Sequence, residues 1–361
     1  MIYSPGLRSR IESQLLWNSD TNGPAHIHTS GITQPPLLAV AVERVAHALP
    51  PDTARTFVAT MLPALIRYHD WLYRERDPED VGLVVCLHSW ESGMDDAPYW
   101  SAAMGRLPRP PLRWRWVREL RPVNPAERAR TIDLQHMLAL AQILKRYRYD
   151  SRALIEHSSV VIVDLAFNSI LATANEALER LSETCNHPLP AALPRHFRAT
   201  RQALETLWDH HTETYYSHDY RTGRRLREPT AANFMPLFAG TATPVHADAL
   251  RRQLVGDTGY NVPFPVPSVP TSSPDFNARR YWRGPTWINL NWFIIEGLKR
   301  YGFNDEAGWL RLHTLGLIAK SGFREYYNPR SGEGLGAREF SWTAALTLDL
   351  LAAGDGAPPH D

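Results

Sequence analysis

Carboxylates and tryptophans gather in one short segment, residues 88–100, with the sequence HSWESGMDDAPYW. Trp90, Glu91, Asp95 and Asp96 stand there beside a glycine and a proline, which interrupt regular structure. A flat indole ring can cover the face of a sugar, and a carboxyl group can bind sugar hydroxyls or transfer a proton. The segment therefore offers the side chains of a carbohydrate site.

A second segment of this kind is residues 281–292, with the sequence YWRGPTWINLNW. Proline is favoured in the first turn of a helix, so Pro285 predicts that a helix starts here. The side chains before this start, Tyr281, Trp282 and Arg283, would then point into a cavity.

The third segment is residues 323–336, FREYYNPRSGEGLG, followed closely by FSWTAA at 340–345. It places Glu325 among tyrosines and glycines, and Trp342 follows. Glu333 and Glu339 lie near Glu325 in the sequence and carry the same chemical group, so they are rivals for any role as a base.

These three segments resemble the clan of glycoside hydrolase families 63 and 37, which holds processing α-glucosidase I, mannosylglycerate and glucosylglycerate hydrolases, and trehalases. The matching patterns are Glu-Ser-Gly-Met-Asp-Asp-x-Pro at 91–98, the whole of 281–292, and Glu-x-Tyr-Asn-Pro followed by Phe-Ser-Trp-Thr-Ala-Ala at 325–345. A further stretch, TSGITQPP at 29–36, is most similar to the mannosylglycerate hydrolase branch. Several long motifs in one order make a chance match very improbable.

The resemblance implies that Asp95, rather than its neighbour Asp96, is the general acid and that Glu325 is the general base. Inversion at an anomeric carbon needs an acid on the leaving oxygen and a carboxylate on the opposite face to activate water. A closed ring of helices would bring two residues so far apart in sequence to one cavity.

The resemblance also implies a set of substrate-binding residues. Trp282 and Arg283 would line the subsite of the cleaved sugar, and Gln34 and Glu91 would bind its hydroxyls. Asp164 and Asn168, one turn apart on a predicted helix, suit a cavity wall and buried capping equally well. The remaining candidates for the walls of the site are Trp90, Tyr281, Gly284, Trp287 and Trp342.

The composition excludes several other classes of protein. The formal net charge of the 361 residues is +1, which gives no overall attraction to nucleic acid or anionic membrane. Trp and Arg alternate within residues 108–122, but in a neutral chain we interpret this stretch as a loop over the barrel mouth. Two cysteines exclude a disulfide framework. The pairs His26/His28 and His210/His211 lack a third ligand at suitable spacing, so we expect no metal and no cofactor.

Long stretches with apolar residues at helical spacing dominate the chain. They predict helices at 37–49, 52–75, 131–148, 152–184, 193–213, 229–239, 245–255, 285–301, 304–320 and 341–353. Residues 82–88 are the best candidate for an extended piece. The interpretation is an all-α protein, an (α/α)6 barrel that lacks its first helical hairpin: an irregular segment at 1–36, the barrel at 37–353 and a disordered tail at 354–361.

Family members carry a Gln-Trp-x-Trp-Asp-Ser-like motif before the stretch at 29–36, and this chain has none. The missing hairpin predicts exposed apolar faces on the helices at 37–49 or 52–75 and at 341–353, with a possible homodimer through that seam. The predicted function is inverting hydrolysis of a small α-glucoside or α-mannoside such as glucosylglycerate or mannosylglycerate. Alternatives are an oligosaccharide α-glucosidase and a truncated, inactive sugar-binding homologue. The absence of a signal peptide or a long apolar run predicts a cytoplasmic protein without membrane contact.

Overall fold

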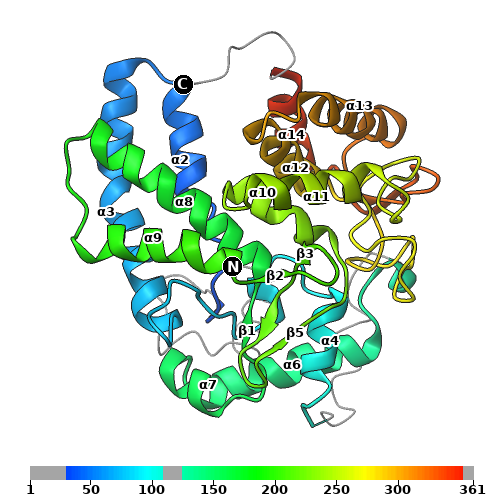
Figure 1. Cartoon of the computed structure of the whole chain (residues 1–361), viewed down its shortest axis with the longest axis horizontal. Helices are drawn as coiled ribbons and strands as arrows, with labels where there is room; N and C mark the ends of the chain where they lie inside the picture. Colours follow the sequence, from blue (N-terminus) through cyan, green and yellow to red (C-terminus); the bar gives the residue numbers. More distant parts are fainter. Residues whose placement is uncertain (1–29, 109–123, 353–361) are drawn as a thin grey trace, which may run out of the picture.

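The computed structural model describes residues 30–108 and 124–352, and most of them lie in helices (Figure 1). Within these ranges, five helices form an inner row in which each packs against the next. Helix α10 is buried all round, and α8 and α12 are buried over most of their surface, as expected for helices with neighbours on several sides. In order of contact, the row is α2 (Leu38–His47), α8 (Leu165–Thr184), α10 (Met235–Ala239), α12 (Ile288–Arg300) and α14 (Ser341–Ala352).

An outer layer of helices covers this row. Helix α9 buries Leu193, Phe197, Thr200 and Leu204, one stripe at helical spacing, and leaves the rest of its surface to solvent. The same single-stripe burial is found in the other outer helices, because each has a neighbour on one side only. The outer helices are α3 (Pro51–Arg76), α9 (Ala192–Glu205), α11 (Pro244–Val255) and α13 (Asn304–Ser321).

The segment between α3 and α8 forms the floor of the site. It contains the short helices η1 (Ser89–Glu91) and η3 (Pro125–Glu127), together with α4 (Pro98–Met104), α6 (Thr131–Arg146) and α7 (Ser151–His157). Helix α4 was not among the helices predicted from the sequence.

Seven short strands in the described part of the chain make the protein mostly helical rather than all-α. Strands β1 (Ile162–Val163), β4 (His218–Asp219) and β5 (Arg224–Arg225) form one antiparallel sheet. Strands β2 (Trp208–Asp209) and β3 (Thr214–Tyr215) form a hairpin, as do β6 (Arg324–Tyr327) and β7 (Gly334–Arg338). Cys86, in the stretch predicted to be extended, bridges to Ile162.

Three predicted helices were too long. The prediction at 285–301 started too early, because α12 begins at Ile288 and Pro285 lies in the loop before it. The prediction at 152–184 is split into α7 and α8, because Val160 to Val163 is a β-branched run that pairs with β4. The prediction at 193–213 ends at Glu205, where the chain turns into the hairpin of β2 and β3. Periodicity alone did not show either break.

The ends of the inner row face each other across a gap between α2 and α14 (Figure 1). Both helices line one cavity there, and Arg44 of α2 spans the gap to Asp349 of α14 and Glu296 of α12. Leu38 on α2 and Leu348 on α14 are 56% and 70% exposed, and Val45 and Leu351 on the same helices are also exposed. Apolar side chains on other helices are exposed to a similar degree, such as Val245 and Leu312, so the predicted apolar seam and the homodimer through it stay predictions.

None of the described helices combines the length and the apolar character that crossing a membrane requires.

Candidate active site

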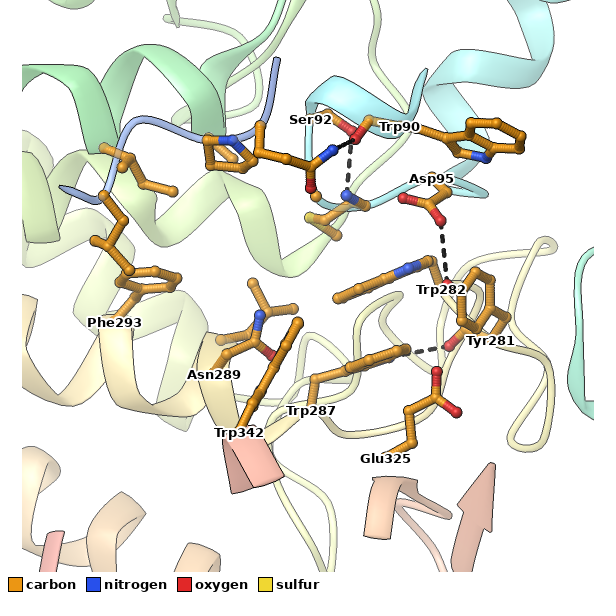
Figure 2. A pocket seen from close by; sticks show the side chains of 18 of the residues that line it. Trp90, Ser92, Asp95, Tyr281, Trp282, Trp287, Asn289, Phe293, Glu325 and Trp342 are labelled. Carbon is orange, nitrogen blue, oxygen red and sulfur yellow. Dashed lines mark hydrogen bonds between the residues drawn. The ribbon is translucent and has the colours of Figure 1, made fainter. Parts of the chain in front are cut away.

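A cavity of about 870 Å³ opens between the inner row and the floor (Figure 2). It lies where the start of α2, the loop after η1, η3, the start of α12, β6 and α14 converge. Asp95 and Glu325 both line it, so the fold brings the two predicted catalytic carboxylates together. The predicted substrate-binding residues that line the same cavity are Gln34, Trp90, Tyr281, Trp282 and Trp342, and Trp287 joins them.

Glu325 projects from β6 and is buried at the edge of the β6–β7 hairpin. Its Oε2 accepts a hydrogen bond from the backbone N–H of Ala337 on β7, at 2.9 Å. Gly336 has φ +65°, and a Cβ there would lie 2.6 Å from the same oxygen. The hairpin can bring its backbone this close to the carboxylate only because residue 336 has no side chain.

Arg128 holds both oxygens of Glu325. Its Nη1 donates to Oε1 at 2.8 Å and its Nη2 to Oε2 at 2.7 Å, and the guanidinium lies over the ring of Tyr281, 5.0 Å from the centroid. A two-pronged contact of this kind fixes the carboxylate in orientation as well as in position.

The chain around η3 fixes Arg128 beside Glu325. The carbonyl of Glu127 accepts from the hydroxyl of Tyr326 at 2.6 Å and from the backbone N–H of Tyr281 at 3.1 Å. The Glu127 carboxylate accepts from the N–H of Gly336 at 2.9 Å. The loop that carries the arginine is therefore tied to the hairpin that carries the glutamate.

Asp95 contacts the hydroxyl group of Tyr281, the side chain over whose ring Arg128 lies. The hydroxyl of Tyr281 donates to Oδ2 of Asp95 at 3.1 Å (Figure 2). Burial and then the nearby carboxylates of Asp95 and Glu325 raise the pKa of Tyr281 well above its usual value, so the phenol stays protonated at neutral pH. Tyr281 has φ +33°, a left-handed conformation that is uncommon for a tyrosine and occurs where surrounding contacts impose it.

Aromatic rings form one wall of the cavity. Trp282 and Trp287 stack face to face with ring centroids 3.7 Å apart, and Trp342 lies 6.0 Å from Trp287. The indole N–H of Trp287 donates to the carbonyl of Tyr281 at 3.0 Å, which fixes the stack against the strained residue. A wall of this kind suits the apolar face of a sugar ring.

Glu91 does not lie on the cavity wall, which corrects its predicted contact with sugar hydroxyls. It is fully buried, and both of its oxygens accept from Arg76 at 2.9 Å. Leu87 and Thr33 donate backbone N–H groups to it as well. Burial alone would raise the pKa of Glu91, but Arg76 and the two backbone N–H donors together lower it. Glu91 thus holds the loop of Asp95 against the segment of Gln34.

Arg283 is also buried behind the wall rather than facing the cavity. Its guanidinium lies 3.4 Å from Asp96 and 3.7 Å from Asp133, and it donates to the hydroxyl of Ser101 at 2.6 Å. Burial raises the pKa of Asp96 to about 7 against the opposing effect of Arg283. The predicted substrate contact of Arg283 is therefore corrected to a contact that joins the Asp95 loop to the second motif.

Gly284 makes a backbone contact outside the cavity lining. Its N–H donates to the hydroxyl of Ser268 at 2.9 Å, and a Cβ would lie 2.4 Å from the carbonyl oxygen of Asn277. The residue permits close packing of two loops, so its predicted contact with substrate is corrected as well.

Asp164 and Asn168 have a structural role, which agrees with the interpretation that they cap and join buried backbone groups. Asp164 caps α8 by accepting from the N–H of Phe167, and it accepts from the hydroxyl of Tyr99 at 2.8 Å. Asn168 pairs with both the N–H and the carbonyl of Val84.

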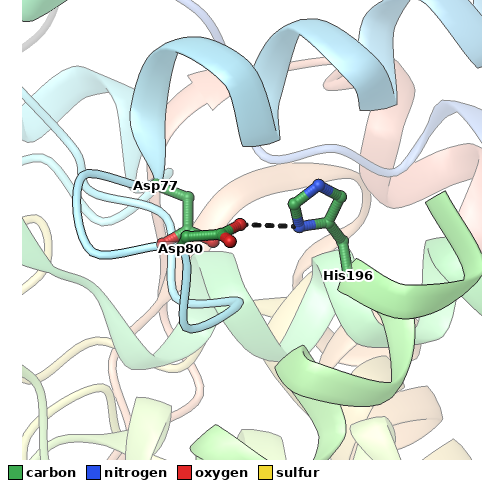
Figure 3. Close-up of side chains that lie close together, drawn as sticks. All are labelled: Asp77, Asp80 and His196. Carbon is green, nitrogen blue, oxygen red and sulfur yellow. Dashed lines mark ion pairs between the residues drawn. The ribbon is translucent and has the colours of Figure 1, made fainter. Parts of the chain in front are cut away.

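One group among the described residues could offer three ligand atoms to a metal ion: Asp77, Asp80 and His196 (Figure 3). Asp77 accepts from the N–H groups of the turn that follows it, and Arg195 holds both oxygens of Asp80 at 2.9 Å. These contacts explain why the three side chains lie close together, because they hold the turn after Asp77 against α9.

The chain is similar to known enzymes over most of its length. Residues 6–343 match the family model described as the mannosylglycerate hydrolase MGH1-like glycoside hydrolase domain. A mannosylglycerate hydrolase of Thermus thermophilus is 40% identical over 321 residues, which are 89% of this chain and 77% of the relative. A glucosylglycerate hydrolase of Mycolicibacterium hassiacum is 31% identical over an alignment that covers 97% of this chain and 82% of the relative.

A solved structure shows the same fold. It is a GH63 mannosylglycerate hydrolase from Thermus thermophilus in complex with Tris and D-glycerate, 39% identical, with a TM-score of 0.84 over 90% of this chain and 78% of that one. The fold and the sequence motifs define a glycoside hydrolase. The chain belongs to glycoside hydrolase family 63, in the mannosylglycerate hydrolase-like group.

Proposed function

We propose that the protein hydrolyses the α-glycosidic bond of a hexosylglycerate with inversion, Asp95 acting as general acid and Glu325 as general base. The observation that carries this proposal is that the two carboxylates line one cavity. Asp95, in the loop after η1, accepts from the hydroxyl of Tyr281, and Glu325, on β6, is held by Arg128, whose guanidinium lies over the Tyr281 ring. An inverting enzyme needs such a pair, one to protonate the leaving oxygen and one to activate water on the opposite face.

The aglycone would be a small carboxylic acid. A cation in the cavity is then required. Arg128 lines the cavity and supplies it, whereas Arg130 is not part of the cavity lining and is held by Asp133 through two contacts at 2.6 and 3.0 Å. In this structure Arg128 lies on Glu325; a substrate carboxylate would take over one or both of its donors and leave Glu325 free to accept a proton from water. Binding of the acid and activation of the base are coupled in this scheme.

The finer architecture belongs to the same proposal. The five inner helices, each in contact with the next, are arranged as an (α/α)6 toroid with one hairpin position open between α2 and α14.

Hydrolysis assays test this function. α-Mannosylglycerate and α-glucosylglycerate should be cleaved faster than trehalose or nigerose, which lack the carboxylate. Glu325→Gln keeps the shape of the side chain and should lower kcat by about 10²–10⁴-fold. Glu333→Gln is the matched control, because Glu333 is exposed and pairs with Arg279 outside the cavity.

Three outcomes would change the proposal. Faster cleavage of nigerose than of either glycerate substrate would favour an oligosaccharide α-glucosidase. Binding of sugars without hydrolysis of any of them would identify an inactive sugar-binding homologue. Equal loss of activity in the two variants would remove Glu325 from the role of base.

A further inference from the structure

Tyr281 is held in one conformation at the wall of the cavity. Its backbone N–H donates to the carbonyl of Glu127 at 3.1 Å, and its own carbonyl accepts from the indole of Trp287 at 3.0 Å. The guanidinium of Arg128 covers its ring, 5.0 Å from the centroid. Its φ of +33° is uncommon for a residue with a side chain, and such conformations persist only where the surroundings impose them. These contacts fix the direction of the phenol hydroxyl.

That hydroxyl points at the carboxyl group of Asp95 (Figure 2). It donates to Oδ2 of Asp95 at 3.1 Å. Among the described residues that line the cavity, Tyr281 is the only tyrosine, so no other phenol there can replace it. Because burial and then the carboxylates of Asp95 and Glu325 raise the pKa of Tyr281 well above its usual value, the phenol keeps its proton throughout the neutral range.

A hydrogen bond of this kind is stronger when its acceptor is charged. As a general acid, Asp95 is neutral before it protonates the leaving oxygen and is a carboxylate afterwards. The bond from Tyr281 therefore strengthens as the proton leaves Asp95, and an interaction that is stronger in the transition state than in the ground state accelerates the step. The hydroxyl also limits rotation of the Asp95 carboxyl group, which must face the leaving oxygen.

We propose that Tyr281 is a positioning residue of the reaction: its hydroxyl holds Oδ2 of Asp95 and stabilises the carboxylate that remains once the proton has passed to the leaving oxygen. In this step the O–H bond of Asp95 and the glycosidic C–O bond break, and the electron pair of the C–O bond stays with the oxygen that receives the proton. Water supplies the hydroxyl that joins the anomeric carbon, Glu325 takes its other proton, and Tyr281 keeps its own. The inference rests on the proposed function in one respect, since it takes Asp95 as the acid.

Titration of Asp95 tests the proposal without turnover. Tyr281→Phe keeps the ring below Arg128 and removes only the hydroxyl. Aspartate labelled at its carboxyl carbon is incorporated, the signal of Asp95 is assigned from its loss in Asp95→Asn, and its pKa is measured by carbon NMR. Tyr215→Phe is the matched control, because it removes a bond of 2.7 Å from a tyrosine to a carboxylate, that of Glu205, and neither residue lines the cavity.

Loss of a donor to the charged form should raise the pKa of Asp95 by about one unit or more in Tyr281→Phe and leave it unchanged in Tyr215→Phe. A ring-fluorinated tyrosine at position 281 should lower the pKa of Asp95 instead, because a more acidic phenol is a stronger donor. This replacement preserves the shape of the side chain, so it tests the proposal even if Tyr281→Phe does not fold, which melting temperatures establish. An unchanged pKa of Asp95 in the folded variants of Tyr281 would overturn the proposal.

Rates on two kinds of substrate complete the test. In Tyr281→Phe, kcat on the preferred hexosylglycerate should fall about 10-fold, whereas kcat on the matching α-glycosyl fluoride should fall less than about 3-fold, because fluoride leaves with little help from an acid. Equal losses on both substrates would overturn the proposal, since Tyr281 would then act on the wall or the sugar rather than through Asp95. If the pKa of Asp95 shifts as expected but no hexosylglycerate is hydrolysed, the proposed function fails and the stabilisation of Asp95 by Tyr281 stands.

Discussion

Arg128 donates two hydrogen bonds to Glu325, at 2.8 and 2.7 Å, from a loop that lies far from β6 in the sequence. The contact is partly open to the cavity, where the arginine side chain is 19% exposed. It joins the group expected to bind the acid of the substrate to the group expected to activate water. The site is therefore assembled around an ion pair that a substrate carboxylate can displace.

This relationship predicts that Arg128→Ala separates two kinds of substrate. KM for a hexosylglycerate should rise by about 10²-fold, because a charge-assisted, two-pronged contact is lost, whereas KM for a neutral disaccharide should change little. Arg130→Ala is the control, since Arg130 is paired with Asp133. Similar losses on charged and neutral substrates would show that Arg128 orients Glu325 without binding the acid.

The two neighbouring aspartates should behave differently. Asp95→Asn removes a carboxyl from the cavity and should lower kcat by about 10²–10⁴-fold. Asp96→Asn alters a buried contact of Arg283 behind the wall, so it should lower the melting temperature more than it lowers kcat. Steady-state kinetics and thermal unfolding of both variants check this, and the reverse order of the two kcat values would assign the acid to Asp96.

Gly336→Ala should impair the base by crowding. The new methyl group would lie 2.6 Å from Glu325 Oε2, so the carboxylate must shift, and kcat should fall by about 10-fold or more. Gly223→Ala is a close control, because Gly223 has nearly the same φ, +67°, with nothing within 4 Å of the added methyl. Both variants should lose on the order of 1 kcal/mol of stability from the left-handed backbone, but only Gly336→Ala should lose activity. Equal kinetic effects would contradict the crowding argument.

Stability should depend on pH through the buried imidazole of His69. Burial lowers the pKa of His69 to about 4, from 6.5, against the opposing hydrogen bond with Asn175. The stability that a neutral His69 contributes is fully present above pH 6.5 and is lost as the pH falls from 6.5 toward 4, at up to about 1.4 kcal/mol per pH unit.

His69→Gln removes that titration. Between about pH 7 and pH 4.5 the melting temperature of the variant should therefore fall less than that of the wild-type protein. Parallel curves over this range would show that folding does not lower the pKa of His69.

The sequence predicted the helices that have one apolar stripe, as in α3 and α11, because a helix with one buried face shows that face directly as periodicity. It also predicted that the segments of Asp95, Trp282 and Glu325 would meet in one cavity, since their acids and aromatic rings are out of place in a helix interior. The predicted helix boundaries were wrong where the chain forms a strand instead of continuing the helix, as at Ile162.

The direction in which a side chain points could not be predicted. Glu91 and Arg283 stand in the same motifs as Asp95 and Trp282, yet each turns away from the cavity toward a buried partner: Arg76 for Glu91 and Asp96 for Arg283. A charged residue in a site motif can bind the ligand or hold the loop, and only the position of the countercharge in space decides between these roles. The contact of Arg128 with Glu325 could not be predicted either, because it depends on the position of the loop around η3.

The stereochemistry of the first product tests the central claim most directly. α-Mannosylglycerate or α-glucosylglycerate, whichever the protein cleaves faster, is hydrolysed in an NMR tube, and the anomeric proton signals of the free sugar are recorded before mutarotation equilibrates them. With Asp95 as acid and Glu325 activating water from the opposite face, the β-anomer should appear first and the α-anomer only later. Initial release of the α-anomer would mean retention through a covalent intermediate, and would contradict the assignment of Glu325 as general base.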